Sequence, residues 1–302
     1  MNLRDLCRQY DIKFKKRLGQ NLLLDDNINR IMVDAAALCP EDDVVEVGAG
    51  LGALTARLCT QAGRVFAVEI DAAFMPCLED RFGDVENVRL FRGDILNHSL
   101  QKLVDEFLPG AASLKMVSNL PYYITTPILF HFLESPVHFS RIVVMVQEQV
   151  AARMVAEVGA SNYGALALAC RYHAGVDIVH AVPRTCFRPE PKVDSCIVRL
   201  RRRAAPLYAD LDWKFLSALI RAAFMHRRKT LRNALTQTGS FGAPKPIVLE
   251  AMAAAEIEAN RRPQTLALDD FARLAIEIRK RIDCSTKSGV RSENEHVLPA
   301  SF

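Results

Sequence analysis

The sequence lacks paired cysteines, long apolar runs and a strong excess of either charge. Its eight cysteines are scattered singly, with no Cys-x-x-Cys and no Cys/His cluster at metal-ligand spacing, which argues against a metal site and a disulfide framework. No apolar run approaches the ~18–20 residues of a membrane span, and the first residues lack the apolar core of a signal peptide. The composition, half hydrophobic and a quarter charged, is that of a globular protein, which we expect to be cytoplasmic.

The net charge of only +4 hides a basic block between Arg184 and Arg232. Thirteen Lys or Arg and four acids there give +9, so the rest of the chain carries about −5. Such a block predicts a surface that faces a polyanion. A solvated face beside a domain boundary is the plainer alternative.

Short apolar strands alternate with amphipathic helices over the first two hundred residues. Strands are expected at 44–47, 64–70, 88–91, 115–119 and 141–147, and helices at 51–58, 72–82 and 127–133. This alternation predicts an α/β fold with a parallel, doubly wound sheet.

The last two expected strands, 176–182 and 193–200, are separated by a segment with three prolines in ten residues. Prolines cannot form the crossover helix that a parallel return needs, so the two strands are expected to pair as an antiparallel hairpin. A mostly parallel sheet with a terminal antiparallel hairpin is similar to the Rossmann-like class I methyltransferase fold. We therefore place one α/β domain over residues 1–203.

Strand patterns stop after residue 203. Helices are expected at 211–224, 229–236, 246–254 and 268–281, which predicts a small all-α domain over residues 204–283. Residues 284–302 are polar and aperiodic, and we expect a disordered tail there. No periodic interface stripe is evident, so a monomer is expected.

Three motifs follow consecutive strands. Gly48 and Gly50, in a Gly-x-Gly-x-Gly segment, let the backbone turn tightly close to a ligand. Glu69 ends the next strand, where a carboxylate can accept both ribose hydroxyls of an adenosine. Asp94 follows the third strand and can accept a hydrogen bond from an adenine amine. The glycine turn and Glu69 fit NAD and S-adenosylmethionine alike, whereas an Asp after the third strand is typical of methyltransferases.

The segment that closes the fourth strand separates these two cofactors; it reads Ser118-Asn119-Leu120-Pro121-Tyr122. An aromatic amine is a poor nucleophile because its lone pair is delocalised into the ring. Two acceptors that hold its two hydrogens direct the lone pair at an electrophilic methyl. The Asn119 side-chain oxygen and a backbone carbonyl of the Leu120–Pro121 stretch can supply this pair, and Tyr122 can stack on the base.

At these residues the chain resembles the ribosomal RNA adenine dimethyltransferase family, whose signature is Asn-Leu-Pro-Tyr. Segments 16–25, 187–195 and 227–233 resemble three further motifs of the family, the last that of its small-subunit branch, the KsgA/RsmA type. The resemblance covers residues 13–281. Leu22 and Ala49 stand where Phe and Pro are common, which we expect to tune cofactor binding rather than abolish it.

The resemblance implies methyl transfer from S-adenosylmethionine, with no metal, to two adjacent adenines in the 3′-terminal hairpin loop of small-subunit rRNA, giving N6,N6-dimethyladenosine. The implied cofactor contacts are Asn21, Leu23, Gly48, Gly50, Glu69, Asp94 and Asn119. The implied catalytic set is Asn119, Leu120, Pro121, Tyr122 and Phe187, with the flipped base stacked between Tyr122 and Phe187. The cations expected to dock the immature 30S subunit are Arg221, Arg227, Arg228, Lys229 and Arg232.

Three other functions stay open at this point. A large-subunit rRNA dimethyltransferase of the antibiotic-resistance type shares the Asn-x-Pro-Tyr chemistry. An NAD-dependent dehydrogenase would use Gly48, Gly50 and Glu69 but leaves Asn119 and Tyr122 unexplained. A small-subunit assembly factor that has lost catalysis would keep only the basic surface.

Overall fold

The computed structural model describes residues 3–15, 18–208, 211–226, 228–237 and 243–294. The chain forms two compact units: Met1–Val155 with His173–Ala204, and Ala156–Tyr172 with Ala205–Phe302. Across the described residues, none of the helices combines the length and apolar character needed to cross a membrane.

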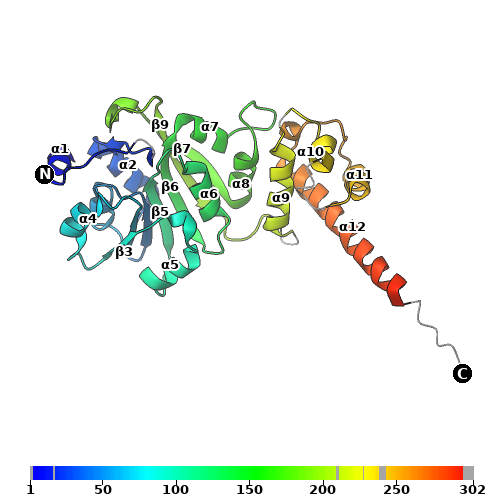
Figure 1. The fold of residues 1–302 in the computed structure, drawn as a ribbon, viewed down its shortest axis with the longest axis horizontal. Coiled ribbons are helices and arrows are strands. Elements are labelled where there is room, and N and C mark those ends of the chain that lie inside the picture. The colour runs from blue at the N-terminus through cyan, green and yellow to red at the C-terminus, as the bar shows by residue number, and fades with distance from the viewer. Residues whose placement is uncertain (1–2, 16–17, 209–210, 227, 238–242, 295–302) are drawn as a thin grey trace, which may run out of the picture. The chain divides into compact units, whose positions relative to one another are not determined.

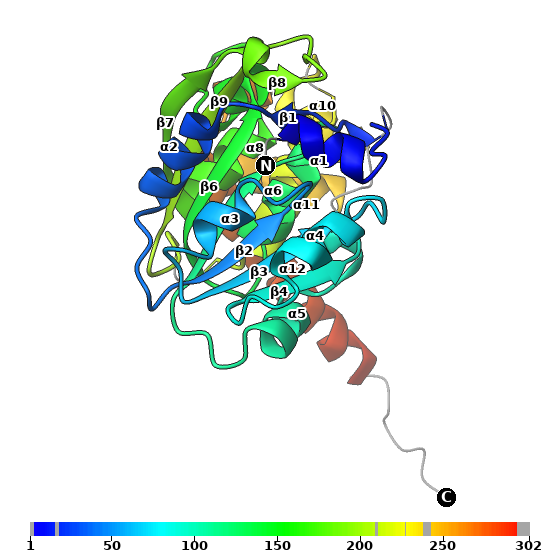
Figure 2. The same cartoon turned by 90° about the vertical axis from the view of Figure 1, so that its left-hand side faces the viewer.

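The first unit is built on a seven-stranded sheet with helices on both faces (Figures 1 and 2). Neighbouring strands follow the order β4-β3-β2-β5-β6-β9-β7. The strands are β2 (Asp43–Val47), β3 (Arg64–Glu69), β4 (Val88–Arg92), β5 (Leu114–Asn119), β6 (Phe139–Gln147), β7 (Ala174–Val182) and β9 (Ser195–Arg202). Strands β2 to β6 pair in parallel, whereas β9 is antiparallel to both β6 and β7. The predicted fold class, including the antiparallel hairpin, is confirmed.

The helices of this unit cover the sheet and hide its central strands. All five residues of β2 are buried, as expected for a parallel strand covered on both faces. The helices are α1 (Leu3–Gln9), α2 (Asp26–Ala36), α3 (Thr55–Leu58), α4 (Met75–Phe82), α5 (Leu100–Phe107), α6 (Thr125–Leu133) and α7 (Glu148–Met154). Helix α3 is shorter than the predicted 51–58, because a turn with Gly52 at φ +75° precedes it.

Strands β2 and β5 part before their carboxyl ends. Their parallel pairing stops at Val45 and Met116. Beyond that point the Val47 N–H donates to the Ser118 hydroxyl instead, at 2.8 Å. The end of β2 stays bonded to β3 and the end of β5 stays bonded to β6. A gap therefore opens between β2 and β5, at the point where the strand order reverses, which is the usual ligand position in such sheets.

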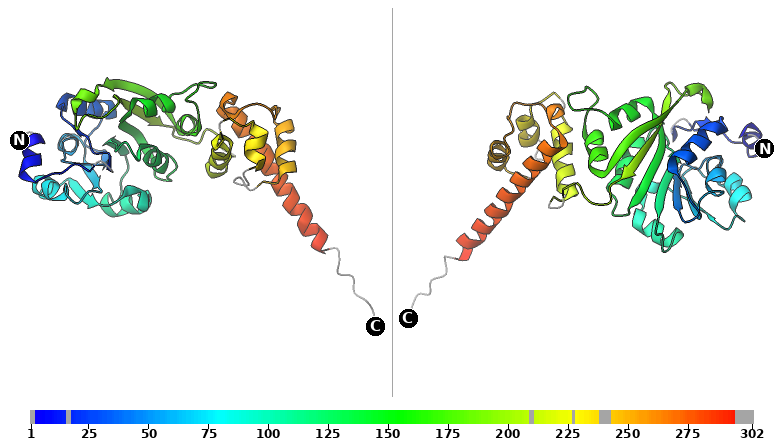
Figure 3. Two further views of the ribbon diagram at one scale, coloured as in Figure 1. Left: turned by 45° about the horizontal axis from the view of Figure 1, so that its top comes forward. Right: turned by 180° about the vertical axis from the view of Figure 1, so that it is seen from behind.

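The second unit is a helical cluster made of α8 (Ala165–His173), α9 (Trp213–Phe224), α10 (Leu231–Gln237), α11 (Lys245–Ala254) and α12 (Leu268–Asn294), seen from two further sides in Figure 3. Tyr163 and Leu168 belong to the same buried cluster as Leu219 and Phe271. The Tyr163 hydroxyl also donates to the Leu266 carbonyl at 3.0 Å. The expected division at residue 203 is therefore wrong for residues 156–172, whose apolar side chains pack with helices far along the chain.

Helix α12 corrects a second expectation, since it continues to Asn294, beyond the expected start of a tail at residue 284. The lack of apolar periodicity after residue 283 therefore does not mean a lack of structure. A helix needs an apolar stripe only where it packs, and α12 supplies Phe271, Leu274 and Ile278 to the core before that point. Residues 295–302 lie outside the described part of the chain.

Replacing Ser118 by Ala tests the parting of β2 and β5. The change leaves the Val47 N–H buried without its partner, so we expect the free energy of unfolding to fall by about 1–3 kcal/mol. Urea denaturation followed by circular dichroism measures this. Ser140→Ala is the control: its hydroxyl donates at 3.1 Å to the Leu114 carbonyl and is only half-buried, so its loss is expected to be smaller. Equal losses would contradict the role given to Ser118.

Candidate active site

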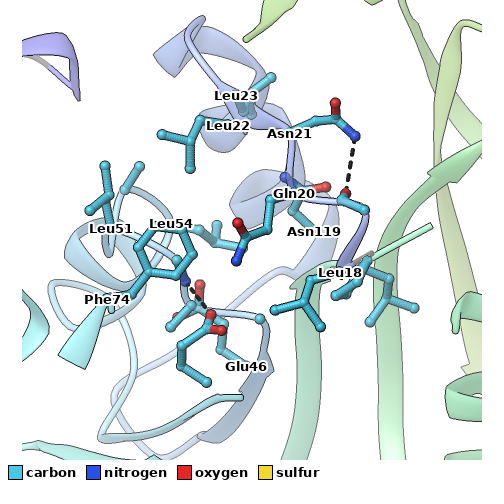
Figure 4. A pocket seen from close by; sticks show the side chains of 18 of the residues that line it. Leu18, Gln20, Asn21, Leu22, Leu23, Glu46, Leu51, Leu54, Phe74 and Asn119 are labelled. Carbon is cyan, nitrogen blue, oxygen red and sulfur yellow. Dashed lines mark hydrogen bonds between the residues drawn. The ribbon is translucent and has the colours of Figure 1, made fainter. Parts of the chain in front are cut away.

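A pocket of about 800 Å³, counting its open mouth, lies at the carboxyl ends of β2, β3 and β5. Three parts of the chain line it: the glycine turn after β2, the ends of β3 and β5, and residues 18–23 from the N-terminal segment. In Figure 4, Asn21, Leu22 and Leu23 lie on one side of the pocket and Glu46 on the opposite side. The glycine turn, Glu69 and the Asn119–Tyr122 segment therefore meet in one place.

The glycine turn follows the end of β2 closely. Gly48, Gly50 and Gly52 all have positive φ, of +82°, +57° and +75°. A Cβ at Gly48 would lie 3.3 Å from the ring of Pro121, so the turn and the Asn119–Tyr122 segment touch at this residue. Only glycine accommodates both the backbone conformation and the contact.

Two buried carboxyl groups face the pocket. Glu46 accepts a hydrogen bond from the Thr55 hydroxyl at 2.6 Å, and burial raises its pKa to about 8. Glu69 accepts the N–H of Gly50 and that of Asp71, both at 2.8 Å. Burial also raises the pKa of Glu69, and these two N–H groups oppose the rise. A carboxylate has about four acceptor positions, so Glu69 keeps capacity for a ligand's hydroxyl groups.

The segment after β5 forms the neighbouring wall of the pocket. The Leu120 N–H donates to the Met145 carbonyl at 3.2 Å, which fixes the segment to β6. The Pro121 carbonyl accepts the Thr125 hydroxyl at 3.0 Å and the Ile124 N–H at 3.2 Å. Asn119, Leu120, Pro121 and Tyr122 all line the pocket.

Tyr122 is held by its hydroxyl, which lies 2.6 Å from the buried Ser195 hydroxyl. Burial raises the pKa of Tyr122, so the phenol stays protonated. Its ring is therefore the part of Tyr122 that can act on a ligand.

Residues 18–23 form a strap across the pocket, a name kept below for this segment. Its last residues, β1 (Leu22–Leu23), pair antiparallel with β8 (Phe187–Arg188). The Asn21 amide donates to the Gly19 carbonyl at 3.1 Å and is turned toward its own segment (Figure 4). Gly19, with φ +57°, lies against Tyr122 and Tyr123. The strap thus contacts both β8 and the segment that follows β5.

The geometry alone fits either a methyltransferase or a dehydrogenase, and comparison with known proteins decides between these two. The family "Ribosomal RNA adenine dimethylase" matches residues 11–280. The chain belongs to this family. It is a methyltransferase whose donor is S-adenosylmethionine, and the dehydrogenase alternative is excluded.

Individual relatives agree with this assignment. "Ribosomal RNA small subunit methyltransferase A" of Lysinibacillus sphaericus is 41% identical over 90% of this chain and 93% of its own length. The protein of that name from Streptococcus thermophilus is 42% identical over 91% and 95%. Among solved structures, a dimethyladenosine transferase from Plasmodium falciparum matches with TM-score 0.71 and 26% identity, over 86% of this chain and 98% of that one. The 23S rRNA methyltransferase ErmE matches with TM-score 0.60 and 26% identity, over 85% and 99%.

Two residues predicted at the dimethylase site do not line the pocket. Asp94 instead accepts the Leu96 N–H at 3.0 Å, at the start of a short 3₁₀ turn. Phe187 is only 2% exposed, and its ring centroid lies 6.4 Å from that of Tyr122 at 69°. The two rings pack edge to face, so Phe187 must move before a base can lie between them. This packing removes both apolar surfaces from water.

The cations expected to dock the 30S subunit do not share one helix. Arg221 lies in the last turn of α9, Arg228 and Lys229 lie in the connection to α10, and Arg232 lies in α10. Helix α10 begins only after Thr230, whose hydroxyl accepts the Asn233 N–H at 3.4 Å, because Thr caps a helix better than it continues one. Arg227 lies outside the described residues.

Glu46 and Phe74 are buried and line the pocket, although the sequence motifs gave neither residue a role. The sequence does give a reason to single out Glu46, because a carboxylate near the end of an apolar strand and just before a glycine turn is costly to bury without a function. It gives no such reason for Phe74, because the position of Phe74 depends on the turn before α4. The described residues contain no group of three or more His, Cys, Asp or Glu that could hold a metal ion.

Replacing Glu46 by Gln tests the buried carboxyl. Between the ordinary pKa of 4.5 and about 8, the folded protein keeps a proton that the unfolded chain loses, so stability falls as pH rises through this window. Gln cannot ionise and still accepts from Thr55. We therefore expect the variant's stability to exceed the wild type's by a margin that grows through the window, on the order of 3 kcal/mol at pH 7. Urea unfolding from pH 5 to pH 9 measures the margin; parallel curves would refute the raised pKa.

Proposed function

We propose that this dimethylase transfers methyl groups from S-adenosylmethionine to the exocyclic amines of two adjacent adenines in the 3′-terminal hairpin loop of small-subunit rRNA. The observation that carries the proposal is the placement of Asn119 and Leu120 at the mouth of the parted strands, beside the glycine turn and in the same pocket as Glu69. The relatives named for the small subunit are about 40% identical, whereas the 23S enzyme ErmE is 26% identical. This difference favours the small-subunit substrate over the resistance type.

The acceptor amine would be held by the Asn119 side-chain oxygen and the Leu120 carbonyl. Of the two carbonyls left open by the sequence, that of Pro121 already accepts the Thr125 hydroxyl and the Ile124 N–H. Leu120 therefore supplies the second acceptor. Holding both hydrogens aligns the amine's lone pair with the methyl, so catalysis rests on orientation rather than on a covalent intermediate.

The pocket suits the donor. S-adenosylmethionine supplies an electrophilic methyl on a sulfonium, and its adenosine carries ribose hydroxyls. Glu69 would accept those hydroxyls, and Gly48 and Gly50 would let the backbone approach the ligand. Asn21 and Leu23 would cover the donor from the strap, and Asp94 would reach the adenine after leaving its present contact with Leu96. Glu46 adds a negative charge when a cationic ligand favours its ionised form.

The exposed cations Arg221, Arg228, Lys229 and Arg232 would dock the rRNA through phosphate contacts, with Arg227 as an expected fifth. Such contacts position an RNA without reading its bases, so base choice stays with the pocket. We place this reaction in the cytoplasm, on the immature 30S subunit, with the enzyme as a monomer.

Isotopic methyl transfer tests the proposal. Undermethylated small subunits and, separately, large subunits are incubated with labelled S-adenosylmethionine, and the nucleosides are identified by mass spectrometry. We expect N6,N6-dimethyladenosine in small subunits alone. Asn119→Ala removes one of the two acceptors and is expected to lower the rate by about a hundredfold or more.

Asn97→Ala, an exposed asparagine outside the pocket, is the control and is expected to leave the rate unchanged. Label in large-subunit RNA would assign the enzyme to the resistance type. No label in either RNA, with donor binding intact, would leave a non-catalytic assembly factor.

Reversing the charge of Arg228 and Lys229 tests the docking surface. We expect weaker binding to small subunits, with the slope of log K against log salt lowered by about one for each phosphate that the variant no longer binds. Donor affinity, measured by calorimetry, is expected to stay unchanged. Lys280→Glu is the control, since Lys280 pairs with Glu277 on α12 at 2.9 Å. An equal fall in donor affinity would make the segment structural.

A further inference from the structure

Asp71 is a buried carboxylate that the reaction described above does not use. It lies two residues beyond Glu69, at the carboxyl end of β3, and is 2% exposed. Its own N–H donates to Glu69 at 2.8 Å. Because a buried charge is costly without partners, the groups that surround it indicate its role.

Both oxygens of Asp71 bind the N-terminal segment. Lys15 Nζ lies 2.6 Å from Oδ1, and Gln20 Nε2 donates to Oδ2 at 2.7 Å. Gln20 Oε1 in turn accepts the Lys15 N–H at 2.7 Å. The Ala73 N–H also donates to Oδ1, at 3.0 Å. Lys15, Gln20 and Asp71 thus form a closed hydrogen-bonded triangle across more than fifty residues of sequence.

The electrostatic balance at Asp71 agrees with an ion pair held in place. Burial would raise the pKa of this carboxyl, but the hydrogen bonds from Lys15, the Ala73 N–H and Gln20 outweigh it and keep the pKa below its ordinary value. Asp71 is therefore charged at neutral pH and keeps its ion pair with Lys15.

The triangle is a second anchor for the strap. The first anchor is the pairing of Leu22 and Leu23 with β8. Gln20 lines the pocket while its amide binds Asp71, so the strap is attached to β8 on one side of the pocket and to the end of β3 on the other. A segment fixed at both ends loses less conformational entropy when a ligand binds beneath it.

We propose that Asp71 is a positioning residue for donor binding: through Lys15 and Gln20 it holds the strap over the donor, and through its N–H it holds Glu69 toward the donor's ribose. The inference rests on the proposed assignment of this pocket to S-adenosylmethionine. It requires no group on Asp71 to touch the donor.

Lys15→Met removes the ion pair and keeps the length of the side chain. We expect the Kd and KM for S-adenosylmethionine to rise about tenfold, with kcat unchanged. Lys13→Met is the matched control, because Lys13 pairs with Asp11 where both side chains are more than four-fifths exposed, at 84% and 85%. The Kd of the Lys13→Met variant for S-adenosylmethionine is expected to equal that of the wild type. Lys15→Arg, which keeps the charge, is expected to restore most of the affinity.

Asp71→Asn tests the other partner. If Lys15 and Asp71 act through one contact, the double variant binds the donor no more weakly than the weaker single variant. Additive losses, equal affinities for the Lys15 and Lys13 variants, or a loss of kcat with Lys15→Met would each overturn the inference. Glu69→Ala distinguishes failure of the pocket assignment from failure of the role given to Asp71. If Glu69→Ala leaves the affinity for S-adenosylmethionine unchanged, the pocket assignment itself fails. If Glu69→Ala binds the donor weakly while Lys15→Met binds it normally, only the role of Asp71 is overturned.

Discussion

The site depends on the hydrogen bond from the Val47 N–H to the Ser118 hydroxyl, which replaces main-chain pairing where β2 and β5 part. Parallel strands can separate inside a protein only if the released main-chain groups find other partners. The serine meets this condition with one side chain, and each strand end stays bonded to its outer neighbour. The glycine turn, Glu69 and Asn119 then surround the opening without any loop having to leave the sheet.

Buried carboxyl groups are the second constraint on this site. Glu46, Glu69 and Asp71 all lie within two residues of a strand end, and each has different surroundings. Asp71 is compensated by Lys15, so it acts as an anchor. Glu69 has only main-chain N–H groups, and Glu46 has only a hydroxyl, so both remain under-compensated. A cationic ligand supplies what these two lack, which makes ligand binding and charge compensation the same event.

Features that depend on residues close together in the sequence could be predicted, whereas contacts between residues far apart in the sequence could not. Glu69 and Asn119 end strands, and Gly48 and Gly50 directly follow one. Parallel strand ends share one edge of the sheet, so their meeting followed from the pattern alone. The strap's second anchor joins Lys15 to Asp71, and no local pattern pairs them. The same holds for residues 156–172, which pack with helices that begin about forty residues or more later. The end of α12 was missed because the sequence after residue 283 shows no apolar period.

The distribution of titratable groups bears on how the acceptor's proton leaves. Of the described residues that line the pocket, three can titrate: Glu46, Glu69 and Tyr122. The two carboxyl groups lie with the glycine turn and the end of β3, on the donor's side. Tyr122, on the acceptor's side, stays protonated and is bound to Ser195. Asn119 does not ionise. In the proposed arrangement the acceptor's side would offer two hydrogen-bond acceptors and no base, so alignment alone would activate the amine and its proton would leave during or after transfer. A second transfer to the same nitrogen is compatible with this arrangement, since a methylated amine still donates one hydrogen bond to Asn119 or to Leu120.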